Sequence, residues 1–258
     1  MNRFPSRSSP WPFWLDLGML SIWGILLLKY WVTDQIVFLL HPNFIGLTVG
    51  TGLVFLFMAG FRLRRWLDEQ KSRSRGRQST TTLQHLSLFP PGWSTMLLIL
   101  TAMVGLLYTP QPFTSDIALR RGVADMVMVT QAQPQAFRTS SRPEERSITD
   151  WVRTLNVYPE PDAYAGQAVD VSGFAIHPPD LPNNYIIISR FILTCCAADA
   201  YPVGLPVKLA SDRADYPADQ WFRIKGEMAT ENLNDTRRLT VVADGIESIP
   251  VPKNPYDY

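Results

Sequence analysis

Residues 11–32 read WPFWLDLGMLSIWGILLLKYWV, and this stretch decides the fold of the first part of the chain. Its only charged side chains are Asp16 and Lys29. A helix of 22 residues spans roughly 33 Å, enough to cross the ~30 Å hydrocarbon core of a bilayer. Tryptophan and tyrosine gather at both ends, as they do at the two membrane interfaces. The stretch therefore predicts a transmembrane helix.

A cleaved signal peptide is the alternative for this first segment, because Arg3 and Arg7 precede the apolar run. The run is longer than a usual signal core, however. It also ends in Lys29-Tyr30-Trp31 rather than in a small-residue cleavage site. The sequence favours a retained helix.

Two further apolar runs predict spans at residues 44–61 and 93–108. Residues 92–112 carry no charge at all. The spacing of Gly46 and Gly50 is typical of closely packed membrane helices. The run at 93–108 would be roughly 24 Å long as a helix, so it needs neighbouring residues to cross the core. We expect about three spans within a membrane domain, residues 1–112.

The distribution of basic residues predicts the orientation. A basic loop at 62–78, between the second and third runs, holds seven lysines and arginines but only two acids. An excess of lysine and arginine marks cytoplasmic loops. Nucleic-acid or anionic-lipid binding is the alternative, but a topological role is favoured beside a span. We expect a multi-pass protein of the cell membrane, with a cytoplasmic N-terminus and an extracytoplasmic C-terminal domain.

Two polar residues in the membrane domain, His41 and Asp16, are candidate transport ligands. His41 and Pro42 lie where the second span begins, and Asp16 lies in the first. A histidine at a bilayer edge can bind a transported ion. The alternative, which we favour, is an interfacial polar residue followed by a proline that starts the helix.

Residues 113–146 are expected to be a linker, and residues 147–258 a second domain. Ser147 and Asp150 form a plausible N-cap pair for a helix over 148–156. Five short β-strands follow, at 168–174, 185–193, 205–209, 221–226 and 239–246. Gly173 and Gly226 end alternating stretches, where glycine often marks a kink or bulge. The fold class expected is α + β, with the membrane helices followed by a small all-β, OB-like barrel.

An OB-like barrel raises the question of nucleic-acid binding, and the charge pattern argues against it. Residues 151–258 contain more acidic than basic side chains and lack a lysine or arginine cluster that could follow a phosphate backbone. We expect no nucleic-acid partner. The lipid bilayer is the partner that the apolar runs imply.

The two cysteines of the chain, Cys195 and Cys196, lie side by side where a strand is expected to end. Together with Asp199 and His177, they could bind zinc or another transition metal. The spacing is not a known ligand motif, and successive residues of an extended chain point in opposite directions. Thiol redox chemistry, or a structural role with one buried and one half-exposed cysteine, are the alternatives.

Several stretches of the second half resemble the YcgQ-type bacterial membrane proteins. They are RFILTCCAADA, from Arg190 and Phe191 to Ala200, followed by Pro202 and Gly204; WFRIKG, from Trp221 to Gly226; and Pro255-Tyr256-Asp257-Tyr258. The resemblance implies a subunit of a two-component permease whose partner is a larger, multi-helix membrane protein. A histidine-rich cytoplasmic loop found in some members is missing here, where only His85 stands.

Two functional hypotheses follow. In the first, the chain is an accessory subunit of a membrane permease, and its outer domain binds or gates a ligand, with a metal ion at the cysteine pair as the candidate. In the second, it is a membrane-anchored structural or assembly module whose outer domain binds a protein. We expect no enzymatic activity, because the sequence contains neither a CxxC motif nor a recognisable catalytic set.

Overall fold

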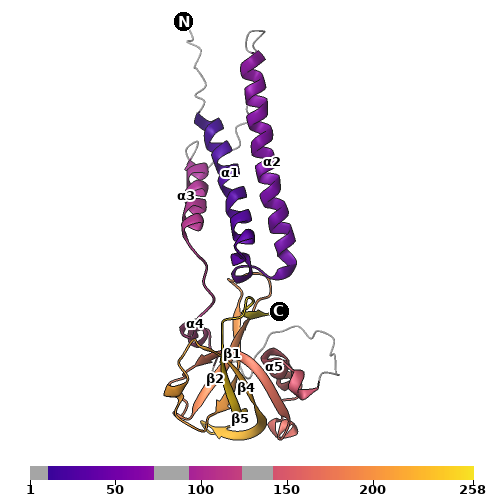
Figure 1. The fold of residues 1–258 in the computed structure, drawn as a ribbon, viewed down its shortest axis with the longest axis vertical. Coiled ribbons are helices and arrows are strands. Elements are labelled where there is room, and N and C mark those ends of the chain that lie inside the picture. Colours follow the sequence, from indigo (N-terminus) through magenta and orange to yellow (C-terminus); the bar gives the residue numbers. More distant parts are fainter. Residues whose placement is uncertain (1–10, 73–92, 124–141) are drawn as a thin grey trace. The chain divides into compact units, whose positions relative to one another are not determined.

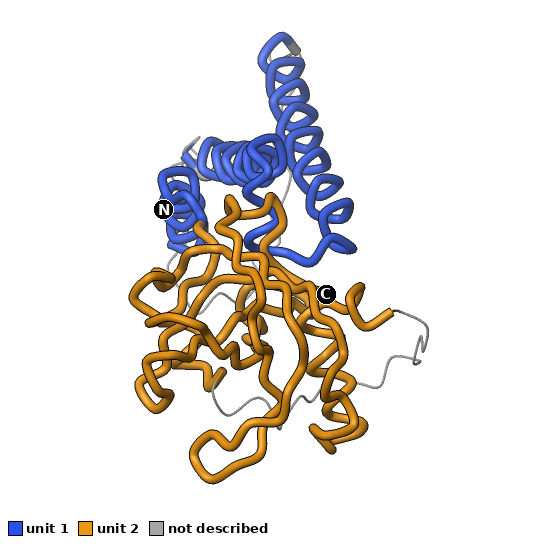
Figure 2. Tube along the Cα trace, turned by 60° about the horizontal axis from the view of Figure 1, so that its bottom comes forward, with its two compact units in different colours: residues 1–110 blue, residues 111–258 orange. Residues whose placement is uncertain are grey.

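A computed structural model describes residues 11–72, 93–123 and 142–258 (Figure 1). The chain divides into two compact units, residues 1–110 and 111–258 (Figure 2). The first unit contains only helices among its described residues, and the second contains the β-sheet. The N-terminal residues 1–10, the end of the basic stretch (73–78), His85 and part of the predicted linker lie outside the described residues.

The first unit contains α1 (Trp11–Val32), the short 3₁₀ helix η1 (Gln35–Phe38), α2 (Pro42–Ser72) and α3 (Trp93–Leu107). Two stretches, Phe13–Val32 and Pro42–Lys71, are long and apolar enough to cross a membrane. Only 22% and 11% of these stretches are buried within the structure. A core helix of a soluble protein would be mostly buried, so the exposure favours membrane association.

One prediction about the helical region is wrong, and another is not confirmed. The second helix does not end at residue 61, because α2 continues through the basic stretch to Ser72. Arg62, Arg64 and Arg65 therefore lie on a helix rather than in a loop. The third helix has 15 residues, about 22 Å in length, so the prediction of three full spans is not confirmed.

The close contact between α1 and α2 lies at a different pair of glycines from the predicted one. A Cβ atom on Gly24 would lie 3.0 Å from the Gly52 carbonyl oxygen and closer still to Leu56. Nothing in the described residues lies within 4 Å of such an atom on Gly46 or Gly50. Gly24 and Gly52 thus permit the close approach of the helices.

Polar side chains of α1 join the other two helices. Asp16 pairs with Arg62 of α2 at 3.3 Å. Lys29 Nζ donates to the Leu106 carbonyl at 2.7 Å, and the Tyr30 hydroxyl donates to the Gly105 carbonyl at 2.6 Å. These carbonyls belong to the last turn of α3, which has no helical donors of its own. Lys29 thus caps the C-terminal end of α3.

The start of α2 is defined by a proline and a neighbouring histidine. Pro42 is its first residue, where a proline costs no hydrogen bond. The His41 Nδ1 atom accepts a hydrogen bond from the backbone N–H of Asn43 at 3.1 Å. Pro42 therefore starts the helix, as predicted, and the place of His41 at a membrane interface stays a prediction.

The second unit contains a six-stranded sheet rather than the five strands predicted. Its strands are β1 (Ala168–Ile176), β2 (Tyr185–Ile192), β3 (Tyr201–Lys208), β4 (Trp221–Leu233), β5 (Thr236–Ile249) and β6 (Tyr256–Asp257). The order is β1-β4-β5-β3-β2-β6, and β1 also pairs with β2. Among themselves, the first five strands each have two neighbours, and their pairings form a ring. The extra strand, β6, runs parallel to the end of β2.

Glycines permit close approach of strands at the predicted positions. A Cβ atom on Gly173 would clash with the Ser189 carbonyl oxygen, and one on Gly226 with that of Val242. The register between β4 and β5 shifts between Lys225 and Gly226, which confirms the predicted bulge. The longest strands are β4, with 13 residues, and β5, with 14.

Helix α5 (Ile148–Val157) contributes to the core of the sheet. The predicted cap is confirmed: Ser147 and Asp150 form a capping box with reciprocal side-chain-to-backbone hydrogen bonds. Ile148, Trp151 and other apolar side chains of α5 pack among the buried residues of the strands. Part of the predicted linker also belongs to this unit, because α4 (Ser115–Arg120) contacts β1.

Candidate metal-binding site

The two cysteines lie in the connection between β2 and β3, which we call the metal loop (residues 194–200). The chain here is a turn rather than an extended strand, so the side chains do not diverge. The two Sγ atoms lie 3.6 Å apart. Cys195 is exposed and Cys196 is half-buried, so the alternative with one buried cysteine is wrong.

Asp199 organises the turn. Its two carboxylate oxygens accept hydrogen bonds from the backbone N–H groups of Cys195, at 2.7 Å, and Cys196, at 3.1 Å. The Asp199 N–H in turn donates to the Cys196 carbonyl at 3.1 Å. Aspartate is suited to such turns, because its short side chain reaches backbone groups of neighbouring residues.

The same carboxylate controls the charge of the thiol. A hydrogen bond to Asp199, followed by the contact with Cys196, raises the pKa of Cys195 to about 12. Burial alone would raise the pKa of Asp199, but donors from the Cys195 thiol and the backbone outweigh it and lower that pKa. The metal-free loop thus holds a carboxylate and a protonated thiol at neutral pH, and a bound cation would have to displace the proton.

The donor set fits a tetrahedral divalent ion. Ligand atoms of Cys195, Cys196 and Asp199 all lie within 4.8 Å of one another. In a tetrahedral zinc site with Zn–S bonds of about 2.3 Å, two sulfurs are about 3.8 Å apart. The observed 3.6 Å is close to that edge. Among the described residues, no fourth histidine, cysteine or carboxylate joins the group.

His177 is not brought to the cysteines. It follows β1, and its Nε2 atom lies 2.8 Å from the carbonyl oxygen of Tyr216. The expected set of four ligands is therefore a set of three. A site with three protein ligands has an open position for water or an exchangeable ligand.

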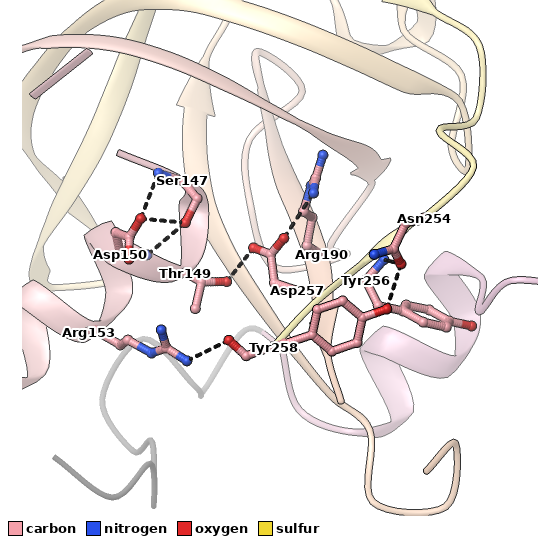
Figure 3. Close-up of a pocket in the computed structure, with 9 residues that line it drawn as sticks. All are labelled: Ser147, Thr149, Asp150, Arg153, Arg190, Asn254, Tyr256, Asp257 and Tyr258. Atoms are coloured by element: carbon pink, nitrogen blue, oxygen red, sulfur yellow. Dashed lines mark hydrogen bonds and ion pairs between the residues drawn. The ribbon is translucent and has the colours of Figure 1, made fainter. Parts of the chain in front are cut away.

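A second polar cluster joins β2 to β1, β6 and α5, and we call it the clasp (Ser172, Arg190, Asp257 and Thr149). Figure 3 shows Arg190, Asp257 and Thr149. Arg190 pairs with Asp257 at 2.9 Å, with side chains 18% and 15% exposed. The guanidinium also donates to the Ser172 carbonyl and hydroxyl oxygens. Thr149 donates to the second Asp257 oxygen at 2.6 Å. The charges of this cluster are satisfied by one another.

The clasp forms part of the lining of a cavity of about 450 Å³. Across it, Arg153 donates to the main-chain oxygen of Tyr258 at 3.2 Å, and the Tyr258 hydroxyl donates to Asn254 at 2.7 Å (Figure 3). Tyr256 also lines the cavity, and burial raises its pKa to about 12. The cavity is lined by two guanidiniums and two carboxylates, Asp150 and Asp257, so its charges offset one another.

The remaining motif residues shape the sheet around these two clusters. Phe191 stacks on Phe174 at a ring separation of 5.8 Å, and the Arg190 guanidinium lies over the Trp221 ring at 5.3 Å. A Cβ atom on Gly204 would lie 2.5 Å from Ile187. Pro202 lies opposite Phe191 in the pairing of β2 with β3. Pro255 is buried just before β6, and Gly226 lies at the bulge of β4.

Sequence reasoning missed the residues that surround the motif from elsewhere in the chain. Thr149 and Arg153 come from α5, while Phe113 and Arg121 flank α4. Phe113 packs on the Phe191 ring at 4.8 Å. No local pattern distinguishes these residues, because their partners are distant in the sequence.

Comparison with known proteins agrees with the predicted resemblance. Residues 144–258 match the family model of the DUF1980 C-terminal domain. The UPF0703 protein YcgQ of Bacillus subtilis (strain 168) is 29% identical over 130 residues. That match covers 48% of this chain and 45% of the relative, so it spans about half the length of each. No solved structure matches this chain.

Proposed function

We propose that this chain is an accessory subunit of a membrane permease whose outer domain binds a divalent, thiophilic metal ion. The match of residues 144–258 to the DUF1980 C-terminal domain and the similarity to protein YcgQ support a place among the YcgQ-type proteins. Cys195, Cys196 and Asp199 hold the ion, and zinc is the ion that they fit best. The convergence of their ligand atoms within 4.8 Å is the observation that supports the proposal. Exposure of Cys195 gives the ion access from solvent.

The open fourth position suits a subunit that delivers its ion. Structural zinc sites are usually closed by four protein ligands, whereas sites with three leave one position for exchange. Release is aided by Asp199, because a proton that returns to the Cys195 thiol is stabilised by this carboxylate. Binding is therefore proposed to be reversible and to strengthen as pH rises.

The helical unit anchors this domain in the membrane, with α3 as a third span. An N-terminus inside and a C-terminal domain outside require an odd number of crossings. The last carbonyls of α3 accept hydrogen bonds from Lys29 and Tyr30 of α1, which removes the cost of exposing them to lipid. Protease accessibility of a C-terminal tag in spheroplasts tests this topology, and a protected tag would contradict it.

Two finer assignments belong to the same proposal. The ring of pairings among the first five strands supports an OB-like barrel. The multi-helix permease partner docks on α1 to α3. Replacing these helices with unrelated spans should abolish co-purification with that partner and leave the zinc content of the chain unchanged.

The site itself is tested by metal analysis of the full chain, purified in detergent without chelator. We expect about one zinc ion per chain for a single three-ligand site. Cys195→Ser and Cys196→Ser should each remove it, since one thiolate and a carboxylate hold zinc poorly. His177→Ala is the matched control and should retain the ion. Zinc retained by Cys196→Ser, or lost from His177→Ala, would show that the ligand set is wrong.

A structural or assembly module is the second candidate, and one observation favours it. Both oxygens of Asp199 are already bonded to backbone N–H groups, so the turn is stable without a metal. In that case the wild-type chain contains no zinc. The cysteine variants would then change the thermal stability of the chain without changing any metal content. We propose a binding role rather than catalysis in either case, because a protonated Cys195 thiol is a poor nucleophile.

A further inference from the structure

The segment at the start of the second unit, which we call the strap (residues 111–123), lies against motif residues of that unit. Its Phe113 ring packs on Phe191 at 4.8 Å and on Tyr256 at 5.6 Å. Ala118 and Val123 are fully buried. The strap is therefore a packed part of this unit.

Arg121 connects the strap to the metal loop. Its guanidinium donates a hydrogen bond to the carbonyl oxygen of Ala200, the residue after Asp199. The same group lies over the Phe113 ring at 5.1 Å, which fixes its direction. Ala200 is buried, so this carbonyl has little access to water in place of Arg121.

The metal loop is thus held at both ends. At its entrance, the backbone N–H of Leu193 donates to the Asp257 carbonyl at 3.0 Å. At its exit, the carbonyl of Ala200 is held by Arg121. Between these points the three ligands must turn together onto one ion. Loss of the exit contact would leave Asp199 and the thiols less well oriented.

The strap follows α3 closely along the chain. Only residues 108–114 separate the end of α3 from the start of α4. The backbone N–H of Ser115 donates a hydrogen bond to the carboxylate of Asp219, which precedes β4 in the second unit. A change in the metal loop that reaches Arg121 therefore acts on the segment that leads directly from α3.

We propose that Arg121 is a positioning residue for the metal site, and that the strap couples metal occupancy to the segment leaving α3. The proposal rests on the proposed function of the loop. Coupling of this kind is reciprocal: if the strap contact strengthens metal binding, bound metal stabilises the strap contact by the same free energy. The segment that follows α3 in the chain thereby responds to the occupancy of the outer site.

The test compares variants of the full chain in detergent, with zinc as the ligand and cobalt(II) as the spectroscopic probe. Arg121→Met keeps the aliphatic length over Phe113 and removes the donors. It should weaken zinc binding about tenfold, as expected for a hydrogen bond from a charged donor, and should alter the cobalt–thiolate absorption. Arg121→Lys keeps a donor and should restore most of the affinity.

Arg120→Met is the matched control, because Arg120 is 78% exposed and pairs with Asp116 on its own helix. It should leave the zinc affinity and the cobalt spectrum unchanged. Hydrogen exchange supplies the second readout: zinc should slow amide exchange at residues 115–123 in the wild type and in Arg120→Met, but not in Arg121→Met.

The outcomes separate the two proposals. If the wild type binds zinc, and Arg121→Met binds it as tightly as Arg120→Met does, the proposed role of Arg121 is wrong but the proposed function is not. Zinc binding that leaves exchange at residues 115–123 unchanged would overturn the coupling. A wild-type chain that binds no zinc would overturn the proposed function and this inference together.

Discussion

The metal loop and the clasp both extend from the end of β2, and they use polar side chains in opposite ways. In the clasp, Arg190 and Asp257 are nearly buried, and their charges are satisfied by one another and by neighbouring hydroxyl and carbonyl groups. In the loop, Cys195 is exposed, and the thiols retain bonding capacity beyond their contacts with each other and Asp199. A cluster with unused ligand atoms can bind an ion, whereas a self-satisfied one stabilises the fold.

The largest effect, a loss of unfolding free energy, should come from breaking the ion pair of the clasp. Arg190→Met would leave the Asp257 carboxylate with little solvent and without its cation, which costs about 3 kcal/mol of unfolding free energy. Denaturant unfolding of the full chain, followed by tryptophan fluorescence, measures this loss. Arg223→Met is the control, because Arg223 is half exposed in its pair with Asp170 and should cost less than about 1 kcal/mol. Equal losses would remove the distinction between a buried clasp and a surface pair.

For the metal loop, we expect a change in the reactivity of the Cys195 thiol. Asp199→Asn removes the carboxylate that accepts a hydrogen bond from the Cys195 thiol. The pKa of Cys195 should therefore fall from about 12 toward its ordinary value of 9.0. At pH 8 the thiolate fraction rises, and alkylation by iodoacetamide should become at least about tenfold faster, since each pKa unit is a factor of ten. Asp235→Asn, in the turn between β4 and β5, should leave the rate unchanged.

The raised pKa of Cys195 also makes the stability of the folded chain depend on pH. A thiol whose pKa is raised in the folded chain contributes stability that is present below pH 9, its unfolded value, and is lost as pH rises through about 12. Asp199→Asn should therefore flatten the alkaline part of the stability profile of the metal-free chain. An alkylation rate and a profile that both match the wild type would show that Asp199 does not control the thiol.

The sequence predicted those features that depend on neighbours along the chain. The span of α1, the capping box of Ser147 and Asp150, and the bulge at Gly226 follow from local apolar length, capping chemistry and glycine geometry. The convergence of the cysteines with Asp199 was a hypothesis from spacing alone. It depends on a turn where an extended chain would have separated the sulfurs.

Features that depend on distant pairing could not be predicted in the same way. Arg190 and Asp257 were both recognised in the motif, but nothing in the sequence indicated that β6 would pair with β2 and bring them together. Gly46 and Gly50 have the spacing of a packing motif, yet the helix contact uses Gly24 and Gly52. Which face of an apolar helix meets its neighbour is decided by tertiary packing, and spacing within one helix does not contain that information.

The smallest effect should come from the edge of the clasp. Thr149 is buried, and its hydroxyl donates to Asp257 at 2.6 Å. Thr149→Val keeps the shape of the side chain and should cost about 1 kcal/mol, the net value of one hydrogen bond, because Arg190 still neutralises the carboxylate. Thr154→Val on the same helix is the control, since its hydroxyl bonds only the Asp150 carbonyl one turn earlier and contributes little. A loss for Thr149→Val as large as that for Arg190→Met would mean that the hydroxyl, and not the ion pair, holds α5 to β6.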